Sequence, residues 1–208
     1  MKQQNCLVCN KLTGKRSCPA RQVKICAVCC ANLRGKEIRC PVDCPHLSAS
    51  KRYSRKRMEP VRDSEMARRG EKIAAVGEAV IQLVFELEAG IRGLTKSFPD
   101  LTDPDIKEGL ENLRSTYETL DKGIIYTFSS PSPRVQALIR DLQKLVEEKQ
   151  KALDTAGNRV YPLKHVLAAL KEIQDSIEQI SRKSKSGNPY LEFLDSASSI
   201  YETVARPQ

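Results

Sequence analysis

The amino-acid sequence predicts a mainly α-helical protein: a small cysteine-rich module followed by an antiparallel bundle of four or five helices. All eight cysteines lie within residues 1–46. From residue 65 onward apolar residues recur at helical spacing, and breaks that contain proline or glycine divide this region into segments. We therefore expect the cysteine-rich module at residues 1–46, a basic linker at 47–64 and the helical bundle at 65–206.

The spacing of the cysteines suits metal coordination. Cys6/Cys9 and Cys26/Cys29 are each separated by two residues. A pair with this spacing can turn both thiolates toward one ion at about 2.3 Å, so that two pairs complete a tetrahedral site. These four cysteines are the first candidate site.

The remaining candidate ligands predict a second site that interleaves with the first along the chain. Cys18 would join three of Cys30, Cys40, Cys44 and His46, which leaves either Cys30 or His46 unused. The expected cofactor is Zn²⁺, with two ions per chain. Residues 1–46 contain no Phe, Tyr or Trp, so metal binding, which contributes about 10 kcal/mol or more per structural zinc, would supply the missing folding energy.

The pattern Cys6-x-x-Cys9, eight residues, Cys18, seven residues, Cys26-x-x-Cys29 resembles the spacing of B-box and RING-type cross-brace zinc domains. The resemblance covers residues 6–46 and implies two interleaved zinc sites. The chain departs from the B-box pattern at Cys9, where a B-box has histidine, and at Cys40/Cys44, where it has two closely spaced histidines. The central histidine of RING domains is also absent, so the resemblance does not extend to ubiquitin-ligase activity.

Two other uses of the cysteines remain open. The four cysteines of the first site could hold an iron–sulfur cluster, and the Cys29-Cys30 doublet also occurs in redox proteins. A disulfide framework is typical of secreted proteins, whereas residues 1–25 contain six Lys and Arg and no apolar core of a signal peptide. We therefore expect a cytoplasmic protein with metal-bound thiolates.

The charge is distributed unevenly. Residues 1–57 contain 14 of the 35 basic residues and two of the 26 acidic ones, so this segment carries +12 and the rest −3. Such a segment attracts a polyanionic or acidic partner, and Tyr53 could stack on a base; a solvated linker is the alternative interpretation. The candidate nucleic-acid-binding residues are Arg34, Lys36, Arg39, Lys51, Arg52, Tyr53, Arg55, Lys56 and Arg57.

The first half of the bundle follows from apolar spacing and breaks. A stripe from Ile73 to Leu94 predicts a first helix at roughly 64–96, which Phe98-Pro99-Asp100 ends. Asp103-Pro104 predicts the start of a second helix, because proline favours the first helical position. Its seam runs from Ile106 to Ile124, and Gly109 within it could let another helix approach closely.

The second half is divided in the same way. A third helix is expected from Val135 to about Thr155, after the turn 129–133. Pro162 opens a fourth, with a seam from Val166 to Ile180. The break 186–189 precedes a short fifth helix that ends near Ala205.

The sequence offers no catalytic motif. It contains no Gly-rich phosphate loop, no Gly-x-Ser-x-Gly and no His-Glu-x-x-His, and no run approaches the roughly 18 apolar residues of a membrane span. We expect a non-enzymatic zinc-binding adaptor whose basic module binds a protein or nucleoprotein and whose bundle mediates protein interaction, including homo-oligomers. The alternatives are a nucleic-acid-binding protein and an iron–sulfur or redox-sensing protein.

Overall fold

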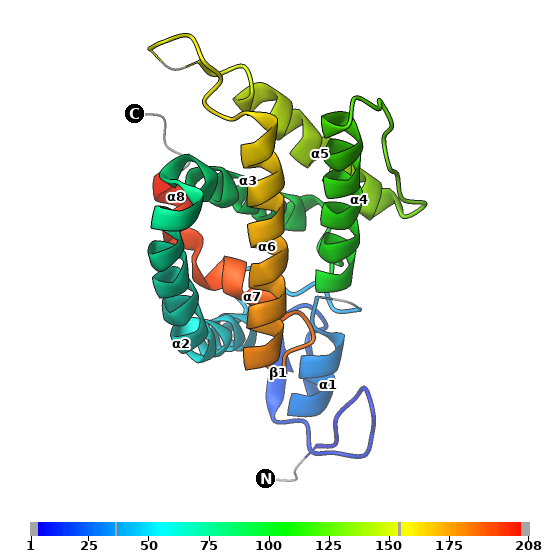
Figure 1. Ribbon diagram of the computed structural model, residues 1–208. Coiled ribbons are helices and arrows are strands. Elements are labelled where there is room, and N and C mark those ends of the chain that lie inside the picture. Colours follow the sequence, from blue (N-terminus) through cyan, green and yellow to red (C-terminus); the bar gives the residue numbers. More distant parts are fainter. Residues whose placement is uncertain (1–3, 36, 154, 205–208) are drawn as a thin grey trace. The chain divides into compact units, whose positions relative to one another are not determined.

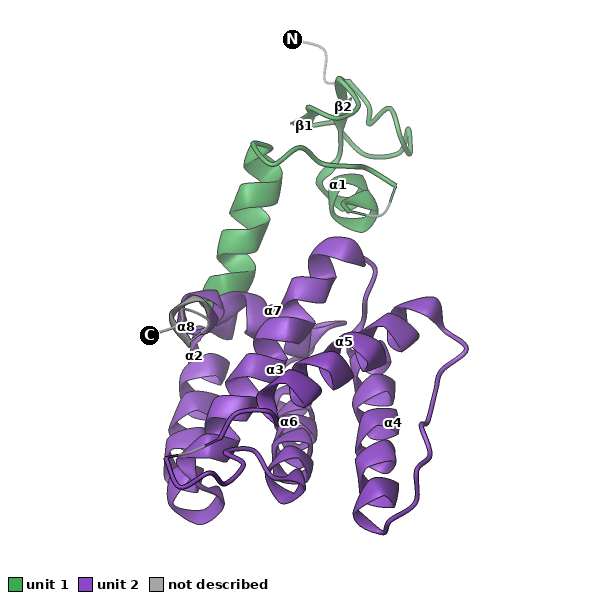
Figure 2. Cartoon of the chain, turned by 90° about the horizontal axis from the view of Figure 1, so that it is seen from above, with its two compact units in different colours: residues 1–56 green, residues 57–208 purple. Residues whose placement is uncertain are grey.

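The computed structural model describes residues 4–35, 37–153 and 155–204. It confirms a mainly α-helical fold with a small two-stranded sheet. The chain separates into two compact units, which we call unit 1 (residues 1–56) and unit 2 (residues 57–208) (Figure 2). Each unit is described by itself below.

Unit 1 is built on a short hairpin and a short helix. Strand β1 (Arg16–Cys18) pairs antiparallel with β2 (Val23–Ile25), with Ser17 opposite Lys24. Helix α1 (Ala27–Leu33) follows β2 directly. The side chains buried between these elements are mostly cysteines, and the large apolar ones among them are Ile25 and Ile38. This core is small for a folded unit, which agrees with the expectation that metal binding is needed.

Helix α2 (Pro45–Val76) contains the segment 47–64 that the sequence predicts as a linker. The helix begins at Pro45, since proline suits the first helical turn. Its first half is rich in Lys and Arg, which favour helix through their intrinsic propensity without any apolar stripe. The division between the two units falls within this helix.

The prediction of one helix at 64–96 is wrong, because two helices cover this range. Gly77 separates α2 from α3 (Glu78–Ser97) and adopts a φ of +90°, a conformation that glycine reaches without a steric penalty. The apolar stripe continues across this break, because Val76 and Val80 both pack against the same core.

The remaining helices follow the predicted breaks (Figure 1). The second, third and fourth expected helices are present, although the third ends at Lys149 rather than near Thr155. In place of the single fifth helix there are two short helices. The helices from residue 103 onward are α4 (Asp103–Asp121), α5 (Pro133–Lys149), α6 (Leu163–Lys183), α7 (Pro189–Ser196) and α8 (Ser198–Val204).

The core of unit 2 lies where α3, α4, α5 and α6 meet. Their seam residues Leu87, Leu110, Leu138 and Ile173 are all fully buried. Gly109 allows the close approach of α4 and α5 that its position suggests: a Cβ atom there would lie 2.6 Å from Leu138 Cδ2.

A buried charged network joins α2, α3 and the C-terminal helices. Arg69, on α2, donates two hydrogen bonds of 2.7 Å to the carboxylate of Glu88, on α3. Tyr190 and Tyr201 donate their hydroxyl protons to the same carboxylate, at 2.8 and 2.9 Å. Burial disfavours the charge on Arg69, but Glu88 holds the pKa of this guanidinium well above its ordinary value. Arg69 therefore keeps its charge inside the bundle, beside the Glu88 carboxylate.

Candidate metal centre

The first cysteine pair sits in a tight turn. The Cys6 N–H donates to the Leu12 carbonyl at 2.7 Å, and the Asn10 N–H donates to the Cys6 carbonyl at 2.8 Å. Asn10 adopts a positive φ of 52°, which asparagine tolerates better than most residues. This turn places the side chains of Cys6 and Cys9 together.

The second pair lies at the junction between β2 and α1. Cys26 follows the last residue of β2 and is the N-cap of α1, where its sulfur accepts a hydrogen bond of 3.3 Å from the Cys29 N–H. A side-chain acceptor at this position satisfies one of the free N–H groups of the first helical turn. The strand, the helix and the cap together orient Cys26 and Cys29.

The four sulfurs form one group. The Sγ atoms of Cys6, Cys9, Cys26 and Cys29 all lie within 4.8 Å of one another, and those of Cys9 and Cys26 are 4.0 Å apart. Four thiolates at about 2.3 Å from a central ion would be about 3.8 Å apart, so a small contraction brings them to ideal geometry. All eight cysteines are free thiols. The sequence prediction of a four-cysteine metal site is therefore confirmed as an arrangement that can hold an ion.

The protonation of these thiols is uneven. Burial raises the pKa of the Cys6 thiol, but hydrogen bonds from backbone N–H groups outweigh this effect and lower its pKa to about 6. Backbone N–H groups likewise lower the pKa of Cys9. The neighbouring Cys26 side chain, burial and the other two thiols raise the pKa of Cys29 to about 12. Four adjacent thiolates repel one another without a cation, so part of the group keeps its protons until a metal displaces them.

Among the described residues, the ligands expected for a second site do not form a group with the short distances of the first site. Cys18, Cys30 and Cys44 are buried, whereas Cys40 and His46 are partly exposed. In the part of the chain that the structure describes, the group of His, Cys, Asp or Glu side chains that meets the distances of a metal site is Cys6, Cys9, Cys26 and Cys29. The second zinc site remains a prediction.

Cys30 has a cationic neighbour instead. Its sulfur accepts a hydrogen bond of 3.6 Å from Arg34. Burial raises the pKa of the Cys30 thiol, but Arg16 and Arg34 lower it further than burial raises it. Arg34, a candidate for nucleic-acid binding, is therefore turned partly toward the cysteine core.

Four of the candidate nucleic-acid-binding residues form a continuous surface on α2. Lys51, Arg52, Arg55 and Lys56 are exposed, and the spacings 51/55 and 52/56 place them on adjoining rows of the helix. We call these four residues the basic face. Tyr53 is 70% exposed on the same helical segment.

The other candidates are placed differently. Arg39 is exposed, and Lys36 lies outside the described residues. Arg57 belongs to unit 2, where it donates a hydrogen bond of 2.5 Å to Glu192. The basic run of the sequence therefore divides between the two units.

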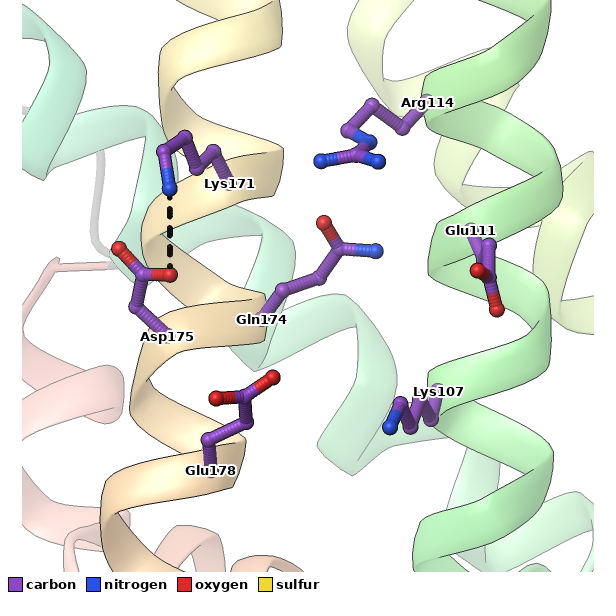
Figure 3. Close-up of a pocket in the computed structure, with 7 residues that line it drawn as sticks. All are labelled: Lys107, Glu111, Arg114, Lys171, Gln174, Asp175 and Glu178. Carbon is purple, nitrogen blue, oxygen red and sulfur yellow. Dashed lines mark hydrogen bonds and ion pairs between the residues drawn. The ribbon is translucent and has the colours of Figure 1, made fainter.

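A polar groove in unit 2 lies between α4 and α6 (Figure 3). Its charges are mixed, and Lys171 and Asp175 pair across one turn of α6 at 3.4 Å. Neither histidine, serine nor cysteine is among the described residues that line it. The lining residues are Lys107, Glu111, Arg114, Lys171, Gln174, Asp175 and Glu178.

Comparisons of the chain with protein-family models, with curated proteins and with solved structures found no match. The resemblance to cross-brace zinc domains therefore rests on the cysteine spacing and the four-sulfur group. Among the described residues, no helix has the length and apolar character that crossing a membrane requires.

Sequence reasoning missed the charged network around Glu88. Arg69 and Glu88 are charged residues, which a helical pattern by itself does not assign to the core. The available signal was that Arg69 lies four residues before Ile73, and Glu88 four residues after Val84, at helical spacing from the apolar stripe of the first expected helix.

Proposed function

We propose that this protein is a non-enzymatic zinc-binding adaptor in which a metal-stabilised basic unit binds a polyanionic or acidic partner and the helical unit mediates protein association. The observation that carries the proposal is the group of four sulfurs within a unit that has almost no other core. The metal would fix the fold of unit 1, and the exposed bases of that unit would make the contact.

The geometry favours a single ion over an iron–sulfur cluster. In a 4Fe–4S cluster each thiolate binds a different iron, and in a 2Fe–2S cluster the two pairs of thiolates bind different irons, so the four sulfurs stand further apart than around one ion that all four share. Elemental analysis and a visible absorption spectrum of the purified protein test this choice. We expect zinc and a colourless protein; bound iron with an absorption band near roughly 400 nm would show that the redox alternative is correct.

The number of zinc ions distinguishes the cross-brace arrangement from a single site. Cys26→Ser should remove the ion of the four-cysteine group, and Cys44→Ser tests the second site separately. Two ions per chain in the native protein, with one lost in Cys44→Ser, would support a cross-brace. One ion per chain that Cys44→Ser retains would restrict the module to Cys6, Cys9, Cys26 and Cys29.

The second candidate function is binding of nucleic acid, and the basic face is the observation that favours it. Four cations in adjoining rows of one helix match the spacing at which a helix neutralises a phosphate backbone. The exposed ring of Tyr53 adds a surface on which an unpaired base stacks.

Binding of single-stranded DNA and RNA at several salt concentrations tests the basic face. Replacing its four residues with alanine should weaken binding and reduce the slope of log K against log salt by about 0.7–0.9 per lost phosphate contact. The matched control removes four exposed cations from unit 2: Lys96, Arg140, Lys144 and Lys164. Equal losses in both variants would indicate nonspecific attraction by net charge.

An acidic protein partner is distinguished by the same variants. If nucleic acid does not bind, the variant without the basic face should fail to capture an acidic protein partner. The unit 2 control variant should capture that partner normally. Deletion of residues 1–56 should abolish capture and leave a helical unit 2 that melts cooperatively. A deletion that unfolds unit 2 would contradict the division into two units.

A further inference from the structure

The connection between α4 and α5 exposes a cluster of large apolar side chains on unit 2. Ile124 is 55% exposed, Ile125 93% and Tyr126 59%, and Leu120 at the end of α4 is 44% exposed. Single exposed apolar residues are common on protein surfaces, whereas a contiguous group indicates an interaction site. The function proposed above does not use this segment.

Hydrogen bonds tie this connection to the side of α4. Three polar residues of α4, spaced so that they share one face of the helix, bond to its backbone. The bonds join Asn112 Nδ2 to the Ser129 carbonyl (3.4 Å), the Phe128 N–H to Thr116 Oγ1 (3.0 Å) and Thr119 Oγ1 to the Tyr126 carbonyl (3.5 Å). The connection runs back alongside α4 in both views (Figures 1 and 2). It is therefore a supported segment with a defined inner edge.

The outer edge of the segment has unsatisfied backbone groups. In an extended chain the N–H and C=O groups of alternate residues point to opposite edges. The Tyr126 C=O and the Phe128 N–H bond to α4, so Ile125 and Thr127 present their N–H and C=O groups to the other side. Within the described part of the chain, no hydrogen bond is formed by the backbone of Ile125 or Thr127. An edge of this kind is a template for another strand.

The geometry points to a second copy of this chain as the strand that pairs with residues 124–128. In an antiparallel pair centred on Tyr126, Ile125 lies opposite the partner subunit's Thr127, and Thr127 lies opposite the partner subunit's Ile125. Each such pair exchanges two hydrogen bonds, so all four free groups of each edge are satisfied. Tyr126 then lies opposite its own copy on the two-fold axis.

The composition of the segment supports this pairing. Ile124, Ile125, Tyr126, Thr127 and Phe128 are all residue types that favour strands, and none carries a charge. The rings of Tyr126 and Phe128 already form an edge-to-face pair with centroids 4.8 Å apart. A second copy supplies the same edge in the matching register, as an isologous dimer requires. This inference rests on the proposed role of unit 2 in protein association and names the surface and the partner.

Sedimentation equilibrium of the full zinc-loaded chain over a range of concentrations tests the dimer. Tyr126→Lys places two like charges opposite each other at the axis, as does Tyr126→Glu, and each variant should raise the dimer dissociation constant at least about tenfold. An equimolar mixture of the two variants should restore dimers, because the opposite charges then face each other. Recovery in the mixture is specific to pairing of residue 126 with its own copy.

Two further variants test the backbone hydrogen bonds and provide a control. Ile125→Pro removes an outward N–H, and with it two of the four hydrogen bonds of the symmetric pair, so it should also weaken the dimer. Val42→Lys is the matched control, since Val42 is as exposed as Ile125 (93%) but lies in unit 1; it should leave the dimer unchanged. Circular dichroism confirms that each variant remains helical.

Several outcomes would overturn the inference. A native chain that stays monomeric at about 100 μM, dimers that all the Tyr126 and Ile125 variants retain, or a mixture that fails to recover would each do so. Binding of a monomeric native chain to phosphatidylcholine–phosphatidylserine vesicles, lost in Tyr126→Lys, would assign the segment to a lipid surface instead. Polyanion binding by the same variants is measured in parallel, so that loss of the dimer and loss of the proposed partner binding are separate results.

Discussion

Asp103 and Asn188 each bond to the N-terminus of the other's helix. The Asp103 carboxylate, in the first turn of α4, accepts hydrogen bonds from the Tyr190 and Leu191 N–H groups of α7 at 2.7 and 3.0 Å. Asn188, the N-cap of α7, accepts the Asp103 N–H through Oδ1 at 3.1 Å. The free N–H groups of two helix starts are thus satisfied by residues 85 positions apart.

Asp103→Ala should destabilise unit 2 by about 1–2 kcal/mol, because the replacement leaves two N–H groups of α7 without an acceptor. Asn188→Ala should cost about 1 kcal/mol for the same reason at α4. Urea denaturation followed by circular dichroism measures both. Asp121→Ala, at the opposite end of α4, is the control; it should be neutral or slightly stabilising, since an acid is unfavourable at a helix C-terminus.

Glu88→Gln should be far more disruptive than its small change in shape suggests. The variant removes the carboxylate that accepts two hydrogen bonds from Arg69 and leaves this buried guanidinium with Glu65, at 3.1 Å, as its remaining counter-charge. Loss of one member of a buried pair costs about 3–5 kcal/mol. Glu118→Gln removes the partner of Arg114 on the surface, where a pair 3.4 Å apart is worth less than about 1 kcal/mol. Similar unfolding free energies for the two variants would show that the Arg69–Glu88 pair contributes little.

A variant that replaces both Arg69 and Glu88 with methionine tests whether the two residues are energetically coupled. Removing both charges leaves neither ion without its partner in the pair, so the double variant should be less destabilised than the sum of its single replacements. The hydroxyls of Tyr190 and Tyr201 lose their acceptor in this variant, which sets a residual cost. Additive single and double effects would argue against direct coupling.

Gly109→Ala should destabilise unit 2 by about 1–3 kcal/mol even though alanine favours helix. The new Cβ would meet Leu138 Cδ2 at 2.6 Å, and the buried leucine must shift within a packed core. Gly93→Ala is the control on α3, where a Cβ meets nothing within 4 Å; it should stabilise by about 0.5–1 kcal/mol. Thermal denaturation of both variants measures the difference in sign.

Zinc affinity should rise with pH across the neutral range. The pKa of Cys29 is raised to about 12, so this thiol holds its proton at pH 7 in the metal-free protein and must release it when zinc binds. Each released proton makes the affinity increase about tenfold per pH unit. Below pH 6 the Cys6 thiol, whose pKa is lowered to about 6, is protonated as well, and the dependence should steepen. Competition with a chromophoric chelator between pH 5.5 and 8 measures the slope, and an affinity independent of pH would contradict the proton displacement.

The sequence predicted those parts of the fold that local signals determine. Helix α4 starts at Asp103 as Pro104 indicated, and the seam residues Leu110 and Leu113 are fully buried. The four-cysteine group followed in the same way from the geometry of two Cys-x-x-Cys pairs. In each case a few neighbouring residues carry the information.

Features that depend on tertiary contacts were not predicted. Residues 47–64 lack an apolar stripe, so the spacing does not predict that they are helical. The spacing predicts a helical seam that runs to Ile124, yet Ile124 lies beyond the end of α4 and is 55% exposed. Glu88 and Arg69 are buried because they face each other across two helices, and no spacing along one helix encodes that pairing. The relation between Cys18, Cys40 and Cys44 is of the same kind, since it depends on long-range placement.

Cys26 directly follows β2, and its sulfur both caps α1 and belongs to the four-thiol group. A bound ion would therefore stabilise the hairpin and the helix together. By mass action, a free zinc concentration one hundred times the dissociation constant favours the folded state by about 2.7 kcal/mol. The availability of the metal would then set how many molecules present the basic face in folded form, so that zinc supply becomes an input to partner binding.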